Sequence, residues 1–163
     1  MPSVSKTDEV KPQIDRLAQS AGSARELMAG MVKLLHEQLL KYNWVGFYML
    51  EEPQDGQAPM LVLGAFEGAM TPHTRIPLNQ GICGAAASSG QTVVVDDVHQ
   101  DPRYLACSLE TKSEIVVPVF AKGKVVGELD IDSHFPAAFG DQDRLLVEYC
   151  AALVGKQMEK FSS

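Results

Sequence analysis

Two cysteines in different local settings are the side chains of this sequence best suited to chemistry. Cys83 lies in the segment QGICGA, whose small residues let the backbone approach a ligand. Cys107 lies in the segment YLACS, and Glu114 follows seven residues later. Two aspartates, Asp130 and Asp132, occupy alternate positions further on. Two thiols and three carboxylates are suited to thiol redox chemistry that needs a proton donor.

The composition excludes several classes of function. With 163 residues, 45% of them hydrophobic, the chain is expected to form one globular domain. A formal charge of −7 argues against nucleic acid and against an anionic membrane surface. No apolar run approaches the roughly 20 residues of a membrane-spanning helix, and the N-terminus has no apolar signal core.

The cysteine count bears on location and metal binding. An odd number of cysteines, three, does not indicate the disulfide framework of a secreted protein, so we expect a cytoplasmic protein. In a reducing compartment a thiol pair is more often catalytic, redox-active or metal-binding than structural. The sequence has no CxxC motif and its four histidines are scattered, so neither a zinc site nor any other metal site is expected.

The elements that must position these side chains follow from hydrophobic patterning. Ser23 and Glu26 form a predicted capping box at the start of a helix over 23–40. A short Ala-rich helix is predicted over 81–89, ended by Gly90, and a longer helix from 140 to the C-terminus. Residues 1–22 are expected to be a helical or flexible extension. Strands are predicted over residues 43–50, 60–66, 74–78, 92–95, 114–120 and 124–132.

The order of these elements predicts the fold class. Most connections are too short for parallel crossovers, so an antiparallel sheet is favoured. We expect an α+β domain whose terminal helices cover one sheet face. The Ala-rich helix and the long loop over 96–110 would cover the other face, with a ligand pocket beneath them.

The combined motifs resemble a known family. They are NWVGFY (43–48), RIPLNQGICGAAA (75–87), DVHQDPRYLAC (97–107), SEIVVPV (113–119) and GELDIDS (127–133). This set resembles a GAF domain and, more narrowly, the free methionine-(R)-sulfoxide reductases, which are single-domain GAF enzymes. The resemblance covers about residues 25–155 and implies one GAF domain over 1–163.

The resemblance implies an activity and roles for individual residues. The chain would reduce free L-methionine-(R)-sulfoxide with electrons from an external thiol such as thioredoxin, without metal or organic cofactor. The resemblance also implies a homodimer, because GAF relatives often dimerise through their terminal helices. The implied roles are Cys107 as nucleophile, Cys83 as second redox cysteine, Glu114, Asp130 and Asp132 as proton-supplying and substrate-binding carboxylates, and Trp44 and Tyr48 as the aromatic lining of the pocket.

One departure from the family pattern keeps other functions open. The family usually has a third cysteine about ten residues before Cys83, and this chain has His73 there. Cys83 is then the remaining candidate to resolve the sulfenic acid that the resemblance implies on Cys107, and direct reduction by a small thiol is the alternative. The alternatives are a GAF module that binds a small metabolite, and a thiol switch formed by the two cysteines.

The single residues also have purely structural explanations. Cys150 lies on the apolar stripe of the last predicted helix and is expected to be a core thiol. The aromatic residues can be ordinary core residues, and the carboxylates can face solvent on a sheet. His99 and His134 are expected to be hydrogen-bonding loop residues.

Strand register provides a geometric test of a shared carboxylate site. A two-residue turn at Lys122-Gly123 would pair Glu114 with Ile131, which places Glu114 on the opposite face from Asp130. An odd loop or a one-residue bulge would correct the parity, and Gly127 is a suitable position for a bulge. We therefore predict one of these two irregularities in the hairpin.

Overall fold

The computed structural model describes residues 5–52, 56, 58–104 and 110–161. Within them, four α-helices and a short 3-10 helix accompany one six-stranded sheet. The helices are α1 (Lys6–Ser20), α2 (Ala24–Gln38), α3 (Gly81–Ser89), η1 (Val98–Gln100) and α4 (Asp141–Phe161). The strands are β1 (Trp44–Glu51), β2 (Met60–Glu67), β3 (Arg75–Pro77), β4 (Val93–Val95), β5 (Ser113–Ala121) and β6 (Lys124–Ser133).

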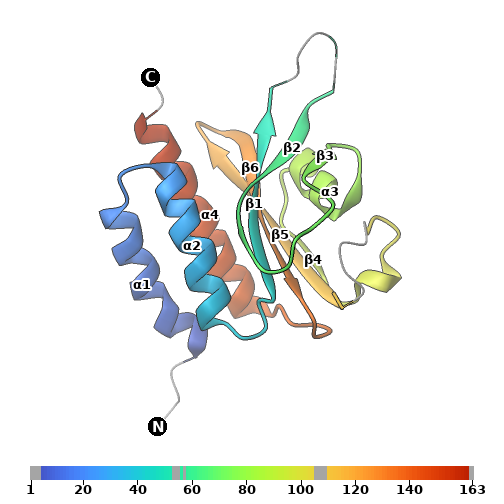
Figure 1. The fold of residues 1–163 in the computed structure, drawn as a ribbon, viewed down its shortest axis with the longest axis horizontal. Helices are drawn as coiled ribbons and strands as arrows, with labels where there is room; N and C mark the ends of the chain where they lie inside the picture. The colour runs from blue at the N-terminus through green and yellow to red at the C-terminus, as the bar shows by residue number, and fades with distance from the viewer. Residues whose placement is uncertain (1–4, 53–55, 57, 105–109, 162–163) are drawn as a thin grey trace.

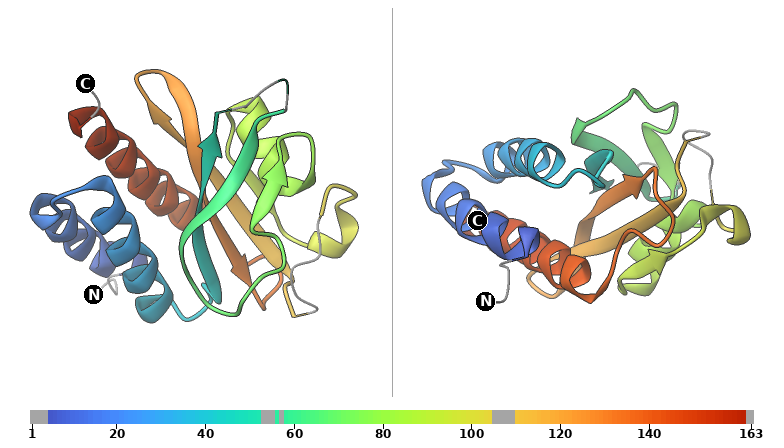
Figure 2. Two further views of the ribbon diagram at one scale, coloured as in Figure 1. Left: turned by 45° about the horizontal axis from the view of Figure 1, so that its top comes forward. Right: turned by 90° about the horizontal axis from the view of Figure 1, so that it is seen from below.

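The sheet separates two layers of different composition. Its strand order is β3-β2-β1-β6-β5-β4, and every pair of neighbours is antiparallel. Helices α1, α2 and α4 lie on one side, and α3 lies on the other (Figure 1). In Figure 2, α1 lies outermost, against α2 and α4. The predicted α+β fold with terminal helices on one face is confirmed.

Apolar stripes explain why α2 and α4 lie on the sheet. The predicted stripe of α2, from Leu27 to Leu39, is buried throughout, and in α4 Cys150 and Val154 are fully buried. The capping box differs in one detail. Ser23 Oγ accepts from the Glu26 amide as predicted, but the Glu26 carboxylate accepts from the Gly22 amide.

The N-terminal helix is more firmly packed than its sequence indicates. Residues 1–22 show only a weak helical pattern, but α1 buries Val10 and Ile14 completely in the main core. Ser5 caps the helix by accepting a hydrogen bond from the Asp8 amide at 3.2 Å. Leu17 and Ala18 also pack against this core, so one face of α1 is fixed on its neighbours.

The hairpin of β5 and β6 contains the predicted irregularity. The turn has two residues, since Ala121 pairs with Lys124. The register then shifts by one, because Phe120 pairs with Val125 while Val119 pairs with Gly127. The bulge places Glu114 opposite Asp132, so that the two carboxylates share a sheet face. The predicted bulge is therefore confirmed.

The glycine at the bulge also permits a close approach between strands. A Cβ built on Gly127 would lie 2.6 Å from the Tyr48 carbonyl oxygen and 2.8 Å from Met49 Sδ. Real Cβ atoms do not approach a backbone oxygen so closely, so a side chain here would push β1 away from β6.

We expect Gly127→Ala to destabilise the protein by about 1–3 kcal/mol, the usual cost of overpacking. The free energy of unfolding, measured by urea denaturation, tests this. Gly64→Ala in β2 is the matched control, because its Cβ would meet its nearest neighbour at 3.5 Å, an ordinary contact. Equal stabilities of the two variants would contradict the expectation.

Candidate active site

Strand β6 presents carboxylates on the face that α3 covers. Glu128, Asp130 and Asp132 alternate along the strand and therefore point the same way, each at most 5% exposed. Glu114 of β5 joins them, because it pairs directly with Asp132. Four buried carboxylates thus lie on one small area of the sheet.

Helix α3 brings a thiol onto these carboxylates. Cys83, in the first turn, is 5% exposed, and its Sγ donates a hydrogen bond to Asp130 Oδ2 at 3.3 Å. The helix lies close to the preceding chain, since a Cβ on Gly84 would be 2.8 Å from the Leu78 carbonyl oxygen. The small residues of the QGICGA segment therefore serve close packing that seats Cys83 over β6.

Aromatic residues of β1 form the next part of the site. Trp44 stacks on Phe66 with ring centroids 5.8 Å apart, and its Nε1 donates to the Ala69 carbonyl oxygen at 3.0 Å. Tyr48, four residues along the strand, donates its hydroxyl to the His73 carbonyl oxygen at 2.6 Å. Both rings are thereby held on the face that carries the carboxylates.

Burial and mutual repulsion determine how these groups ionise. Burial, and then the charges of Asp130 and Asp132, raises the pKa of Glu114 well above its usual range. Burial also raises the pKa of Asp130 and Asp132, but hydrogen bonds from Glu114 act in the opposite direction on both. The raised pKa of Glu114 therefore favours its protonated form, which donates to both aspartates.

The same environment makes Cys83 a weak acid. Burial raises the pKa of its thiol well above the usual range, and the charges of Asp130, Glu128 and Glu114 raise it further. Because a thiolate is the nucleophilic form of cysteine, Cys83 is suited to a step in which a neighbouring base removes its proton.

Glu128 is a member of the cluster that the sequence analysis missed. It is fully buried, and neither carboxylate oxygen accepts a hydrogen bond from any described residue. Burial raises its pKa well above the usual range, an effect that the nearby Cys83 thiol opposes only in part. Its position two residues before Asp130, in the same alternation, was the available signal.

A cavity of about 100 Å³ opens onto this cluster. Trp44, Tyr48, Asp130 and Asp132 all line it, so the structure brings together four of the predicted site residues at one cavity. Its mouth includes His134, which pairs with Glu110 at 3.5 Å. The remaining lining residues are Asn43, Ala69, Met70, Thr71 and Thr111.

The sequence-based predictions for the three cysteines have different outcomes. Cys107, the predicted nucleophile, lies outside the described residues. Cys150 is fully buried in the core between α4 and the sheet, as predicted, and burial raises its pKa to about 12. Among the described residues the thiols of Cys83 and Cys150 are both free.

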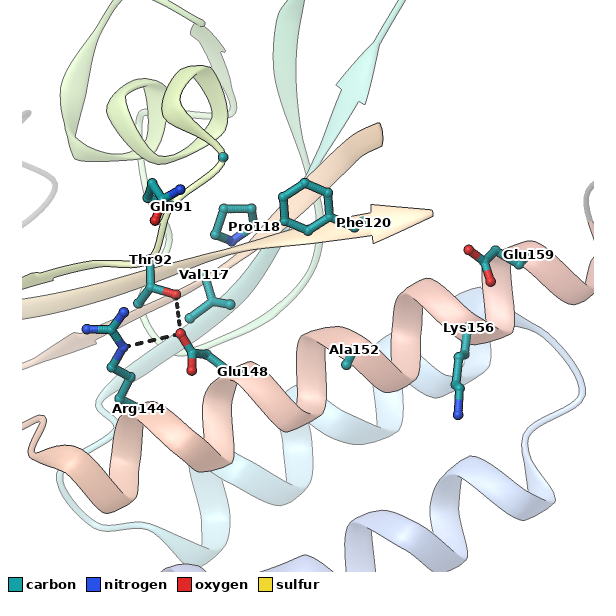
Figure 3. A pocket seen from close by; sticks show the side chains of 11 residues that line it. Gln91, Thr92, Val117, Pro118, Phe120, Arg144, Glu148, Ala152, Lys156 and Glu159 are labelled. Carbon is teal, nitrogen blue, oxygen red and sulfur yellow. Dashed lines mark hydrogen bonds and ion pairs between the residues drawn. The ribbon is translucent and has the colours of Figure 1, made fainter. Parts of the chain in front are cut away.

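A larger groove elsewhere carries less chemistry. It has a volume of about 390 Å³ and lies between α4 and the end of β5 (Figure 3). Its central carboxylate is already engaged, because Glu148 accepts from Thr92 Oγ1 at 2.6 Å and pairs with Arg144 at 3.2 Å. None of the residues that line this groove is a cysteine.

Comparison with known proteins places this arrangement in a family. The family model described as GAF domain matches residues 23–158. The chain belongs to the GAF-domain family. The free methionine-R-sulfoxide reductase of Escherichia coli K12 is 40% identical to this GAF protein over 116 residues. The alignment covers 71% of this chain and 66% of the E. coli protein, just under two thirds of its length.

Solved structures are similar over almost the whole GAF chain. The free methionine-R-sulfoxide reductase from Neisseria meningitidis, in complex with its substrate, has a TM-score of 0.85 and 35% sequence identity. That match covers 98% of this chain and 93% of the other. The substrate complex of the Staphylococcus aureus protein named fRMsr has a TM-score of 0.83 and 35% identity, covering 97% and 99%.

The helices of the GAF protein were also compared with the length of a membrane span. No helix among the described residues has both the length and the apolar composition needed to cross a membrane.

Three side chains of the acidic cluster lie close enough to share a metal ion. Ligand atoms of Cys83, Glu114 and Asp130 all lie within 4.8 Å of one another, which is a spacing that a metal ion could bridge. The linear spacing of these residues conceals the grouping, since each comes from a different element.

We expect Glu128→Gln to stabilise the protein by about 1–2 kcal/mol at pH 8, and by less as the pH is lowered. The pKa of Glu128 is raised in the folded state, so its contribution to stability is full below the unfolded pKa of about 4.3. That contribution is lost as the pH rises through the folded pKa. Urea denaturation between pH 5 and about pH 8 measures the difference.

The control is Glu37→Gln, since Glu37 is exposed on α2. A stability difference between wild type and Glu128→Gln that does not grow with pH, or that favours the wild type at pH 8, would show that Glu128 is not a buried carboxylate that needs a proton.

Proposed function

We propose that this protein reduces free L-methionine-(R)-sulfoxide to methionine with electrons from an external thiol. The observation that carries the proposal is the convergence of one thiol and the acidic cluster beside Trp44 and Tyr48. This arrangement occurs in a chain 40% identical to a free methionine-R-sulfoxide reductase.

The carboxylates suit a substrate that carries an ammonium group. Asp130 and Asp132 line the cavity, and each has one carboxylate oxygen without a hydrogen-bond partner among the described residues. An ammonium group has three donors to satisfy such oxygens, and its positive charge relieves the repulsion between them. The ring of Trp44 offers an apolar surface for the rest of the substrate.

The reduction requires a thiolate and a proton donor. Cys107 is proposed to attack the sulfoxide sulfur, and the oxygen passes to Cys107 as a sulfenic acid while methionine leaves. Glu114, whose pKa is raised, supplies the proton that the sulfoxide oxygen needs. The two described cysteines are poor thiolates, which supports Cys107 as the attacking residue. Tyr104 precedes the segment that contains Cys107 and packs against the buried apolar residues around α3. Glu110 follows that segment and lines the cavity.

Cys83 is proposed to complete the cycle. Asp130, which accepts the hydrogen bond of the thiol, takes its proton while the sulfur of Cys83 attacks the sulfenic sulfur. The S–S bond forms as the S–O bond breaks, and the proton passes on to the departing hydroxide, which leaves as water. A thioredoxin-like protein then reduces the disulfide. Homodimer formation and a cytoplasmic location stay predictions from the sequence.

Replacement of Cys107 tests the first step. We expect Cys107→Ser to lose all turnover of free L-methionine-(R)-sulfoxide with dithiothreitol, while its thermal unfolding stays that of the wild type. Cys150→Ala is the control, because it removes a thiol buried in the opposite core, and it is expected to keep full activity. If Cys107→Ser is as active as the wild type, the proposed nucleophile is wrong. If the folded, reduced wild type has no reductase activity, the proposed function is wrong and a GAF module that binds a small metabolite is the better interpretation.

Replacement of Cys83 tests recycling. With dithiothreitol, a small thiol that reaches the sulfenic acid directly, we expect Cys83→Ser to retain turnover. With thioredoxin as the sole reductant we expect one turnover per protein molecule and then arrest, because no disulfide forms. Methionine formation is measured by chromatography in both assays. Continued turnover of the variant with thioredoxin would remove Cys83 from the cycle.

A further inference from the structure

We propose that Cys83, Glu114 and Asp130 form a binding site for a thiophilic divalent cation of the zinc class, and that this cation competes with substrate. The binding part stands on geometry alone, and the competition part rests on the proposed function. The cation is an inhibitor of this site and not a cofactor of the reaction.

Three different elements of secondary structure supply the ligand atoms. Cys83 comes from α3, Glu114 from β5 and Asp130 from β6, and their ligand atoms lie within 4.8 Å of one another. The Cys83 sulfur is already 3.3 Å from Asp130 Oδ2. Tetrahedral zinc, with bonds of about 2.3 Å to sulfur and about 2.1 Å to oxygen, separates such atoms by roughly 3.6 Å. Small side-chain adjustments therefore suffice to seat the ion.

Buried carboxylate oxygens without hydrogen-bond partners surround these ligands and favour the binding of a cation. Asp130 Oδ1 and both oxygens of Glu128 have no hydrogen-bond partner among the described residues, and both side chains are at least 97% buried. Glu128 lies beside the Cys83 thiol and the Asp130 carboxylate, with which it interacts. Buried carboxylates without partners are costly, and a bound cation satisfies them.

The donor set selects the class of ion. A thiolate is a soft ligand that magnesium and calcium avoid, whereas zinc, cobalt and cadmium bind thiolate together with carboxylate. Three ionised protein ligands around a dication leave a net charge of −1, in place of three like charges. Since the cavity that Asp130 lines is also the proposed substrate cavity, the ion and the substrate ammonium group would compete for the same carboxylate.

The test uses Co²⁺ and Zn²⁺ on the full chain. The protein is first reduced, freed of reductant and kept anaerobic. We expect one Co²⁺ per chain and a near-ultraviolet thiolate-to-cobalt charge-transfer band in the wild type, in Cys150→Ala and in Cys107→Ser. We expect the band to be absent in Cys83→Ser. Zn²⁺ affinity, measured by calorimetry, should fall by at least about tenfold in Asp130→Asn and Glu114→Gln.

Several outcomes would overturn the site. They are an absence of binding in the wild type, a charge-transfer band that persists in Cys83→Ser, and a band that is lost only in Cys107→Ser. Thermal unfolding of each variant shows whether it is folded, and Asp130→Asn serves as the second variant if Cys83→Ser is not.

Competition is measured separately in a single turnover of the reduced protein without added reductant, so that no other thiol binds the metal and recycling through Cys83 does not enter. Zn²⁺ should raise the methionine sulfoxide concentration that gives the half-maximal rate and leave the rate at saturating substrate unchanged. An unchanged half-saturating concentration with the site occupied would overturn competition alone. If the protein has no reductase activity at all, the proposed function fails while the binding result still stands.

Discussion

The register between β5 and β6 is the constraint on which the site depends. Because side chains alternate along a strand, one extra residue decides whether Glu114 faces the acidic cluster or the helical core. The bulge opposite Val119 and Phe120 supplies that residue and sets Glu114 against Asp132. Without it, a carboxylate would enter the layer of apolar residues under α2 and α4, and the cluster would lose the carboxyl group that donates to Asp130 and Asp132.

The two faces of β6 divide stability from chemistry. Leu129 and Ile131 are fully buried under the helices, and they alternate with the carboxylates that face α3. Burial of four carboxylates disfavours folding unless protons, hydrogen bonds or a ligand compensate. The helical layer, which includes α1, buries enough apolar surface to offset this unfavourable free energy. The glycine of the bulge then lets β1 approach, so that Trp44 and Tyr48 lie over the same face.

Most of the fold could be predicted from local patterns, because each long element carries its own periodicity. The bulge could also be predicted, since only two irregularities reconcile the turn with a shared carboxylate face. Sequence patterns did not reveal the depth at which α1 packs, which depends on Val10 and Ile14 meeting helices distant in the chain. They also missed Glu128, whose burial depends on coverage by residues of α3 and β1. The contact between Cys83 and Asp130 spans 47 positions, and no local signal encodes it.

The acidic cluster is best understood as a site that requires positive charge. Burial raises the pKa of Glu114, Asp130 and Asp132 together, so protons supply positive charge to the cluster when no ligand is bound. A substrate ammonium group can replace one of those protons, and a dication can replace more while also binding the Cys83 sulfur. In the two proposals, substrate affinity and sensitivity to thiophilic metals both depend on Asp130, which lines the cavity and lies among the three metal-ligand candidates. Removal of this one carboxylate is therefore expected to weaken both.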